Sequence, residues 1–241
     1  MRKQLDTFIL LFAAISILGI GVSRDAAFAA ATLTGKVAFE GTAPAPKPIS
    51  FGAEKQCAIM HGDKPPVDEG IVVNSNNTVK WALVYIKEGV SGEFKAPDQP
   101  VVVNQKGCLF SPHVAAVMAG QKIDFKNEDA VLHNVRANSK ANKMFNIAQP
   151  IQGMTTTKKF DQPEIGIQMR CDVHFWMSAY IHVLSHPFFA VTGEDGSFTI
   201  KDLPAGNYTL EVWHEALGTQ TQMVTVGEGE SKEVNFSLKK A

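Results

Sequence analysis

The sequence of 241 residues lacks the motifs that identify several large classes of protein. It has 23 basic and 24 acidic residues, and its formal net charge of -1 offers no broad attraction for nucleic acid or for an anionic membrane. A G-x-S-x-G elbow, a P-loop and an H-E-x-x-H motif are all missing. We therefore expect no nucleic-acid partner and none of the enzyme classes that these motifs mark.

Sustained helical periodicity is missing as well. After residue 31 no window keeps an apolar helical period beyond two turns, and short alternating runs are bounded by Gly, Pro, Asn and Asp. This pattern predicts an all-β fold made of sandwiches. The predicted strands cover residues 33–39, 79–87, 114–117, 121–126, 164–171, 179–184, 197–200, 208–213, 220–226 and 233–238.

The one long apolar run lies near the N-terminus. A basic start precedes the run over residues 8–20, and Ala27, Phe28 and Ala29 give the small-x-small pattern of a signal-peptide cleavage site. We expect residues 1–29 to be a signal peptide, cleaved near Ala29. The mature protein would then be exported to the periplasm, with no stable membrane insertion. An uncleaved N-terminal anchor is the alternative, because the run is close to the lower length limit of a membrane helix.

Cysteine is scarce, with three in the whole chain. An exported chain enters an oxidising compartment, where cysteines tend to pair. Cys57 and Cys108 lie in loop-like stretches next to glycine and could form a disulfide, which would leave Cys171 as a free thiol. Two buried free thiols are the alternative.

The remaining cysteine belongs to a group of metal-binding residue types. In MRCDVHFWMSAY, Cys171, His174 and Met177 stand three residues apart. Alternation places Cys171 at the inward-facing end of the strand 164–171, and the loop after it allows His174 and Met177 to return over the same end. A trigonal thiolate site with a weak axial thioether has these donors and needs a second histidine. The residues predicted to share the inward face are Ile165, Ile167 and Met169.

A second histidine is present in FSPHVAAVMAGQKIDFKNEDAVLHNV, which contains His133. Together with RCDVHFWM, this segment resembles the cupredoxins, the small blue copper proteins such as plastocyanin and amicyanin. The resemblance implies a Greek-key cupredoxin sandwich over residues 100–185 that holds one copper ion, cycling between Cu(I) and Cu(II). The ligands that it implies are His133, Cys171, His174 and Met177.

The resemblance also has consequences around the metal. It implies that the backbone N–H of Asn134 points toward the cysteine sulfur. It implies that electrons leave through His174 within an apolar patch, which Val173, Phe175 and Trp176 could supply or could instead bury against the rest of the protein. Phe175 stands where the family often has proline. Zinc binds the same nitrogen and sulfur donors, but a thioether is a poor zinc ligand, so the methionine favours copper.

A second resemblance covers the flanks of this segment. VTGEDGSFTIKDLPAGNYTLEVWHE carries D-G-x-F-x-I followed by L-P-A-G-x-Y-x-L, and it resembles the carboxypeptidase regulatory-like, or prealbumin-like, β-sandwich. LTGKVAFEGTAP and WALVYIKEG resemble other strands of that domain. We expect residues 32–99 and 186–241 to build it, interrupted by the cupredoxin segment. Two consecutive sandwiches are the alternative.

The expected function is one-electron transfer with an unidentified redox protein. A copper enzyme would need a further copper, which multicopper oxidases bind with His-x-His pairs, and the chain has none, so we do not expect a stand-alone enzyme. The alternative is a copper-binding, copper-handling or protein-binding module. Of the other histidines, we expect His182 on the outer face of its strand. The rest, in loops or at strand ends, leave a second metal site open: His61, His113, His186 and His214.

Overall fold

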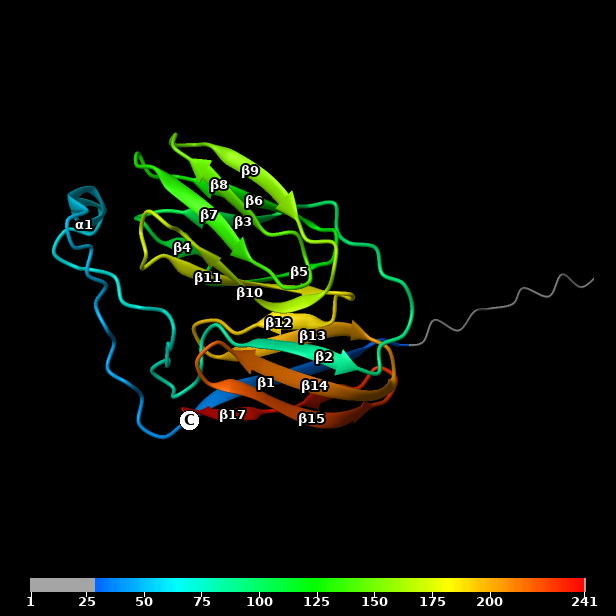
Figure 1. Cartoon of the computed structure of the whole chain (residues 1–241). Coiled ribbons are helices and arrows are strands. Elements are labelled where there is room, and N and C mark those ends of the chain that lie inside the picture. The colour runs from blue at the N-terminus through cyan, green and yellow to red at the C-terminus, as the bar shows by residue number, and fades with distance from the viewer. Residues whose placement is uncertain (1–28, 241) are drawn as a thin grey trace, which may run out of the picture.

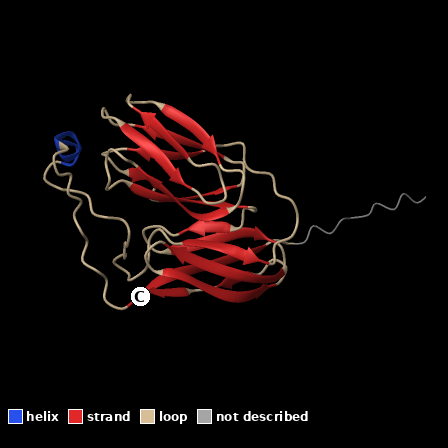
Figure 2. Cartoon of the chain, viewed as in Figure 1, coloured by secondary structure: helices blue, strands red, loops and turns tan. Residues whose placement is uncertain are grey.

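The computed structural model describes residues 29–240, and these form an all-β protein. The strands are grouped in two β-sandwiches, one stacked on the other (Figure 1). The only helix among residues 29–240 is the short α1 (Lys55–His61), as Figure 2 shows by colour. The predicted fold class is confirmed. The predicted signal peptide lies, apart from its last residue, outside the described residues, and within them no helix is long and apolar enough to cross a membrane.

The middle sandwich is built from one continuous stretch of chain. Its strands are β3 (Val101–Gln105), β4 (Phe110–Ser111), β5 (Val114–Met118), β6 (Lys122–Asn127), β7 (His133–Asn138), β8 (Phe145–Gln149), β9 (Thr155–Lys159), β10 (Glu164–Arg170) and β11 (Ser178–Leu184). One sheet has the strand order β5-β11-β10-β7-β8, and the other has β4-β3-β6-β9. A shared apolar core lies between the two sheets.

The outer sandwich takes its strands from both sides of that stretch. They are β1 (Ala31–Glu40), β2 (Leu83–Glu88), β12 (Phe189–Val191), β13 (Ser197–Leu203), β14 (Gly206–His214), β15 (Gly218–Val226), β16 (Ser231–Glu233) and β17 (Phe236–Lys239). One sheet has the order β13-β1-β16, with β17 also paired to β1, and the other has β12-β2-β14-β15. The domain limits stated above stay a prediction.

Strand β10 carries the predicted inward face with one exception. Ile167 and Met169 are fully buried in the middle core, but Ile165 packs on the other face of the sheet, against the outer sandwich. The register of β10 against β11 shifts between Glu164 and Ile167, and Gly166 within that shift has a φ of 79°. The extra residue of this bulge reverses the direction of the side chains before it. The prediction for Ile165 was therefore wrong.

The two sandwiches pack through a small apolar cluster that contains Leu83, Tyr85 and Leu184. His182 points to this boundary and is fully buried, with its ring centroid 4.5 Å from that of Trp213. Its Nδ1 accepts a hydrogen bond from the N–H of Gly166 at 3.1 Å. The expected outer face of its strand is thus covered by the second sandwich, a long-range contact that alternation does not reveal.

Residues 41–70, which we call the strap, leave the outer sandwich and lie along the side of the middle one. Helix α1 lies within the strap, beside the middle sandwich (Figure 1). Phe51 and Cys57 of the strap are buried in the middle core. Cys57 forms a disulfide with Cys108, which confirms the predicted pair. Within the described residues Cys171 is the free cysteine. The prediction missed α1, whose seven residues are too few to display a helical period.

Candidate metal centre

Three of the predicted ligands are brought together by strand pairing. Strand β7 runs antiparallel to β10, and the pairing includes Arg136 with Arg170. His133 is the first residue of β7 and Cys171 follows the last residue of β10, so both lie at the same end of the sheet. His174, in the loop after β10, is 2% exposed, and the other two side chains are as deeply buried.

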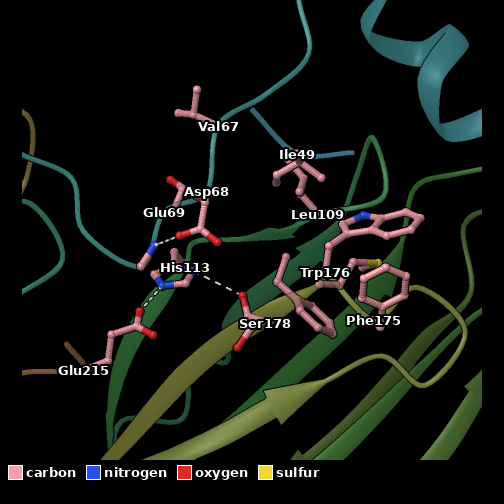
Figure 3. Close-up of a pocket in the computed structure, with 13 residues that line it drawn as sticks. Ile49, Val67, Asp68, Glu69, Leu109, His113, Phe175, Trp176, Ser178 and Glu215 are labelled. Atoms are coloured by element: carbon pink, nitrogen blue, oxygen red, sulfur yellow. Dashed lines mark hydrogen bonds and ion pairs between the residues drawn. The ribbon is translucent and has the colours of Figure 1, made fainter. Parts of the chain in front are cut away.

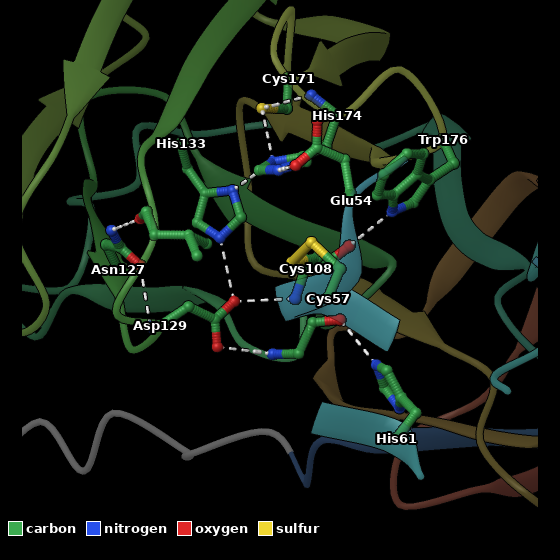
Figure 4. The surroundings of a disulfide bond; sticks show 12 residues. Glu54, Cys57, His61, Cys108, Asn127, Asp129, His133, Cys171, His174 and Trp176 are labelled. Carbon is green, nitrogen blue, oxygen red and sulfur yellow. Dashed lines mark hydrogen bonds and ion pairs between the residues drawn. A yellow bond between two sulfur atoms is a disulfide. The ribbon is translucent and has the colours of Figure 1, made fainter. Parts of the chain in front are cut away.

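The donor atoms of this cluster converge on one point (Figure 4). The Nδ1 atoms of His133 and His174 lie 2.9 Å apart, and the sulfur of Cys171 lies 3.8 Å from Nδ1 of His174. One donor atom from each of the three residues lies within 4.8 Å of the others. Two imidazole nitrogens and a sulfur in this arrangement offer a metal ion a nearly complete coordination sphere.

Met177 is held beside the cluster by a closed loop. The N–H of Met177 donates to the carbonyl of His174 at 2.9 Å, and the N–H of Cys171 donates to the carbonyl of Met177 at 3.3 Å. The side chain of Met177 is fully buried in the same core as Cys171. The backbone therefore folds the C-x-x-H-x-x-M segment into a compact turn at the end of β10.

Hydrogen bonds around Cys171 favour its thiolate. Burial alone would raise the pKa of the thiol, but a hydrogen bond with His133 and the amides of Asn134, His174 and Val173 hold the pKa below its ordinary value. The N–H of His174 donates to the sulfur at 3.4 Å. The side-chain oxygen of Asn134 also accepts from the N–H of Asp172 at 2.6 Å, so Asn134 fixes the loop as well as facing the sulfur.

Asp129 is the residue of the centre that sequence reasoning missed. Its Oδ2 lies 2.9 Å from Nε2 of His133 and accepts a hydrogen bond from the N–H of that nitrogen. Burial lowers the pKa of His133, yet the hydrogen bonds to Asp129 and Cys171 outweigh this and leave the pKa raised. With Nε2 protonated, the lone pair of Nδ1 points into the cluster. Asp129 thus orients His133 as a ligand.

The carboxylate of Asp129 is itself held in place by the turn after β3. The N–H groups of Gly107 and Cys108 donate to its two oxygens, each at 2.7 Å. Burial raises the pKa of Asp129, but His133 and these two amides overcome it and keep the pKa below its usual value. An acidic residue four positions before a histidine was the only signal in the sequence, and it is a weak one.

The strap covers the outer edge of His174 (Figure 4). A carboxylate oxygen of Glu54 lies 4.0 Å from Nε2 of His174. Trp176 packs beside it, with ring centroids 5.3 Å apart, and donates from its Nε1 to the carbonyl of Cys108 at 3.0 Å. The expectation of a surface-reaching His174 was therefore wrong, because a segment distant in the sequence lies over it. Phe175, 72% exposed, does reach the surface.

Comparison with known proteins identifies one segment. Residues 178–239 match the carboxypeptidase regulatory-like domain. This match begins at Ser178, next to Met177, and covers β11 and most of the outer sandwich that follows it. No curated protein matches the chain. The predicted resemblance to a carboxypeptidase regulatory-like domain is thus confirmed for the C-terminal part of the chain, while β11 belongs by its pairing to the middle sandwich.

Solved structures that match include copper proteins. The copper-containing nitrite reductase NirK from Thermus scotoductus SA-01 is 23% identical, with a TM-score of 0.35, over 41% of this chain but only 26% of that protein. A purple cupredoxin from Nitrosopumilus maritimus is 18% identical over 34% of this chain and 98% of its own, with a TM-score of 0.30. An oxidised mutant of amicyanin is 15% identical over 42% of this chain and 97% of its own, with a TM-score of 0.32.

His113, which lies between β4 and β5, connects the end of the loop after β10 with the regulatory-like segment. The Nδ1 of His113 lies 3.1 Å from the carbonyl oxygen of Ser178, and its Nε2 pairs with the carboxylate of Glu215 (Figure 3). Glu215 lies in the turn between β14 and β15. The pair borders a cavity of about 280 Å³ that is also lined by Met177 and Trp176. The outer sandwich therefore supports the loop that carries the predicted axial ligand.

Proposed function

We propose that this protein is an exported, mononuclear type 1 copper protein that transfers single electrons. The observation that carries the proposal is the convergence of Cys171 Sγ with the Nδ1 atoms of His133 and His174 in a buried site. Copper supplies a one-electron couple when bound to such a donor set.

Copper suits the donors better than zinc does. A closed structural zinc site takes four strong nitrogen, sulfur or oxygen ligands, and a thioether is not among them. The described residues offer two imidazoles and one thiolate here, with the buried Met177 in the adjoining turn. Two histidines and one cysteine with a weak axial methionine are characteristic of blue copper sites.

The surroundings favour a site whose shape changes little with the charge of the ion. His133 is held by Asp129, and Cys171 is held at the end of β10 by amide hydrogen bonds. His133 and Cys171 lie at the ends of β7 and β10, and each of these strands is paired with a neighbouring strand on both sides. Ligands that are locked by packing and by further hydrogen bonds keep their positions, which lowers the reorganisation that electron transfer requires.

The exit route proposed for electrons is Trp176 and Phe175 rather than the edge of His174. The ring of Trp176 lies 5.3 Å from that of His174 and 5.3 Å from that of Phe175, measured between centroids. Phe175 and Val173 present an apolar surface to solvent. A redox protein is the proposed partner, and the periplasm remains the proposed location.

Copper handling without electron transfer is the second candidate. One observation favours it, namely that the strap and a disulfide close the edge of His174 and thereby separate the site from solvent. A protein that stores or delivers copper benefits from such a cover. No observation on the described residues favours an enzyme over these two readings.

The test is titration of the mature protein with Cu(II), followed by visible absorption. We expect an intense thiolate-to-copper charge-transfer band that saturates at one copper per chain and is absent in Cys171→Ser. Met169→Leu is the matched control, because Met169 is equally buried two residues earlier on the same strand face but is not a proposed ligand. Absence of the band from folded wild-type protein would refute the type 1 site.

A further inference from the structure

The Cys57–Cys108 disulfide lies against the candidate centre. Both cysteine sulfurs and a ring nitrogen of His174 lie within 4.8 Å of one another. The sulfur of Cys108 also lies within this distance of donor atoms of Asp129 and His133. Both cysteines are fully buried. A disulfide that only ties two loops together needs no imidazole beside it, so this placement calls for another explanation.

We propose that Cys57, Cys108 and His174 form a second metal site, which binds Cu(I) when the disulfide is reduced. A dithiol reductant gives two electrons and two protons, the S–S bond breaks, two cysteine thiols form, and the reductant becomes a disulfide. Binding of Cu(I) then releases the two thiol protons. The ion retains its charge of one throughout, so no further oxidant or reductant is required.

The donor set determines the class of metal. Thiolates are soft ligands that select Cu(I), and an imidazole nitrogen completes a three-coordinate set. The Cα atoms of the two cysteines are 5.6 Å apart, so both sulfurs can still reach one ion after the bond between them is broken. In the oxidised protein the same sulfurs are bonded to each other and cannot act as thiolates. The site therefore exists only in the reduced state.

His174 connects this site to the inner one. Its Nδ1 faces Cys171 and His133, whereas its Nε2 lies 4.0 Å from Glu54 of the strap. A neutral imidazole has one lone pair, so it can serve one ion at a time. We infer that the two outer thiols bind Cu(I) first. His174 then passes the ion to the inner donors. This transfer rests on the proposed function, but the existence of the outer site does not.

Movement of the strap would give Cu(I) access to Cys57 and Cys108. Apart from the disulfide, α1 is held by a hydrogen bond between Nε2 of His61 and the carbonyl of Gly107, at 2.7 Å, and Phe51 packs on Trp176 with ring centroids 5.2 Å apart. Ile59 on the outer side of α1 is 77% exposed. Reduction removes the covalent tether, which leaves the hydrogen bond of His61 and the core packing of Phe51 and Cys57 to hold this part of the strap. Local segments with few buried contacts open most readily.

The experiment uses the full mature chain with Cys171→Ser, so that the inner site has no thiolate. The protein is reduced with a dithiol, desalted without oxygen and titrated against Cu(I) held by a coloured Cu(I) chelator. We expect the reduced variant to remove one equivalent of Cu(I) per chain and the oxidised variant to remove none. Adding Cys57→Ser and Cys108→Ser should abolish uptake, and adding His174→Phe should weaken it at least about tenfold.

Each other outcome overturns the proposal. Equal uptake by the oxidised and reduced forms, or undiminished uptake without Cys57 and Cys108, would place the Cu(I) elsewhere. Circular dichroism follows the fold throughout, and a reduced chain that unfolds and is not refolded by Cu(I) also counts against a built site. The type 1 site is judged separately, by the Cu(II) band of the oxidised wild-type protein, so the two proposals can fail independently.

Discussion

Two groups of buried histidines in this protein differ in what their nitrogens contact. The pair at the candidate centre, His133 and His174, has its Nδ1 atoms 2.9 Å apart and facing a cysteine sulfur. The boundary group lies between or near the two sandwiches, and in the described residues it joins no cluster of three potential ligands. Its members are His113, His182, His186 and His214.

In the boundary group, protein partners take both ring nitrogens of His186 and of His113, whereas Nε2 of His182 has no hydrogen-bond partner. His186 lies 2.9 Å through its Nε2 from the carbonyl of Ile86, and its Nδ1 accepts from the N–H of Phe188 at 3.2 Å. His113 uses one nitrogen for Ser178 and the other for Glu215. Burial is therefore no guide to metal binding here. What separates the groups is whether lone pairs converge on one point with a soft donor beside them.

The largest expected effect comes from removing a histidine of each group in turn. His133→Phe should abolish the thiolate-to-copper band, because one of two converging nitrogens is lost. His214→Phe should leave the band intact, since the Nδ1 of His214 only accepts from the N–H of Ala216. Visible spectra of Cu(II)-loaded, folded variants measure both. A band that depends equally on the two histidines would remove the distinction.

Acid should destabilise the protein through the boundary group. Burial lowers the pKa of His182 to about 3, against 6.5 as its ordinary value. Between these two pH values His182 is protonated in the unfolded chain but not in the folded one. The free energy of unfolding therefore falls as pH drops from about 6.5 toward 3. At pH 4.5 the loss is about 3 kcal/mol.

Urea unfolding of the metal-free protein at pH 7 and pH 4.5 tests this contribution. The same measurement on His182→Leu should give a shallower dependence on pH, because the leucine does not titrate. An identical slope in the variant would mean that other groups account for the acid sensitivity.

Asp129→Asn should weaken copper binding about 10- to 100-fold, the usual cost of losing a carboxylate that orients a ligating histidine. The amides of Gly107 and Cys108 donate to different oxygens of Asp129, and the single side-chain oxygen of an asparagine cannot replace both. The amide NH₂ group also cannot accept a hydrogen bond from Nε2 of His133, so the proton is no longer fixed on that nitrogen. Competition with a chelator of known affinity measures the change. Asp124→Asn, on the solvent-facing side of β6, is the matched control.

The smallest effect is expected for Glu54→Gln. Glu54 is about half exposed and its oxygen lies 4.0 Å from Nε2 of His174, an imidazole whose pKa burial lowers, so this screened electrostatic contact contributes about 1 kcal/mol or less. Copper affinity should change by less than about fivefold, and any change should shrink as salt is added. A large effect at high salt would show that Glu54 binds the metal itself.

The sequence allowed the local parts of this structure to be predicted. Alternation along β10 correctly placed Ile167, Met169 and Cys171 on one inner face, and the scarcity of cysteine correctly paired Cys57 with Cys108. Ile165 was misplaced because the bulge at Gly166 reverses the alternation. A period of two residues cannot reveal an inserted one.

The parts that could not be predicted depend on contacts between distant segments. Asp129 contacts His133 locally, but its carboxylate is held there by the turn at Gly107, and His174 is covered because the strap crosses the sandwich. His182 was expected on an outer face, which the second sandwich covers with Trp213. Patterns within a strand carry no information about which other segment packs on its far side.

The pairing of β1 has a consequence for the order in which the protein takes shape during synthesis. All strand partners of β1, namely β13, β16 and β17, come after residue 196. The middle sandwich needs only residues 101–184 for its ladders. As the chain is made from its N-terminus, β1 can meet residues 77–79 early, through the bridge between Ala38 and Thr78, but the residues of its strand ladders are made only after those of the middle sandwich. The first strand of the described residues therefore completes its ladders only with the last ones.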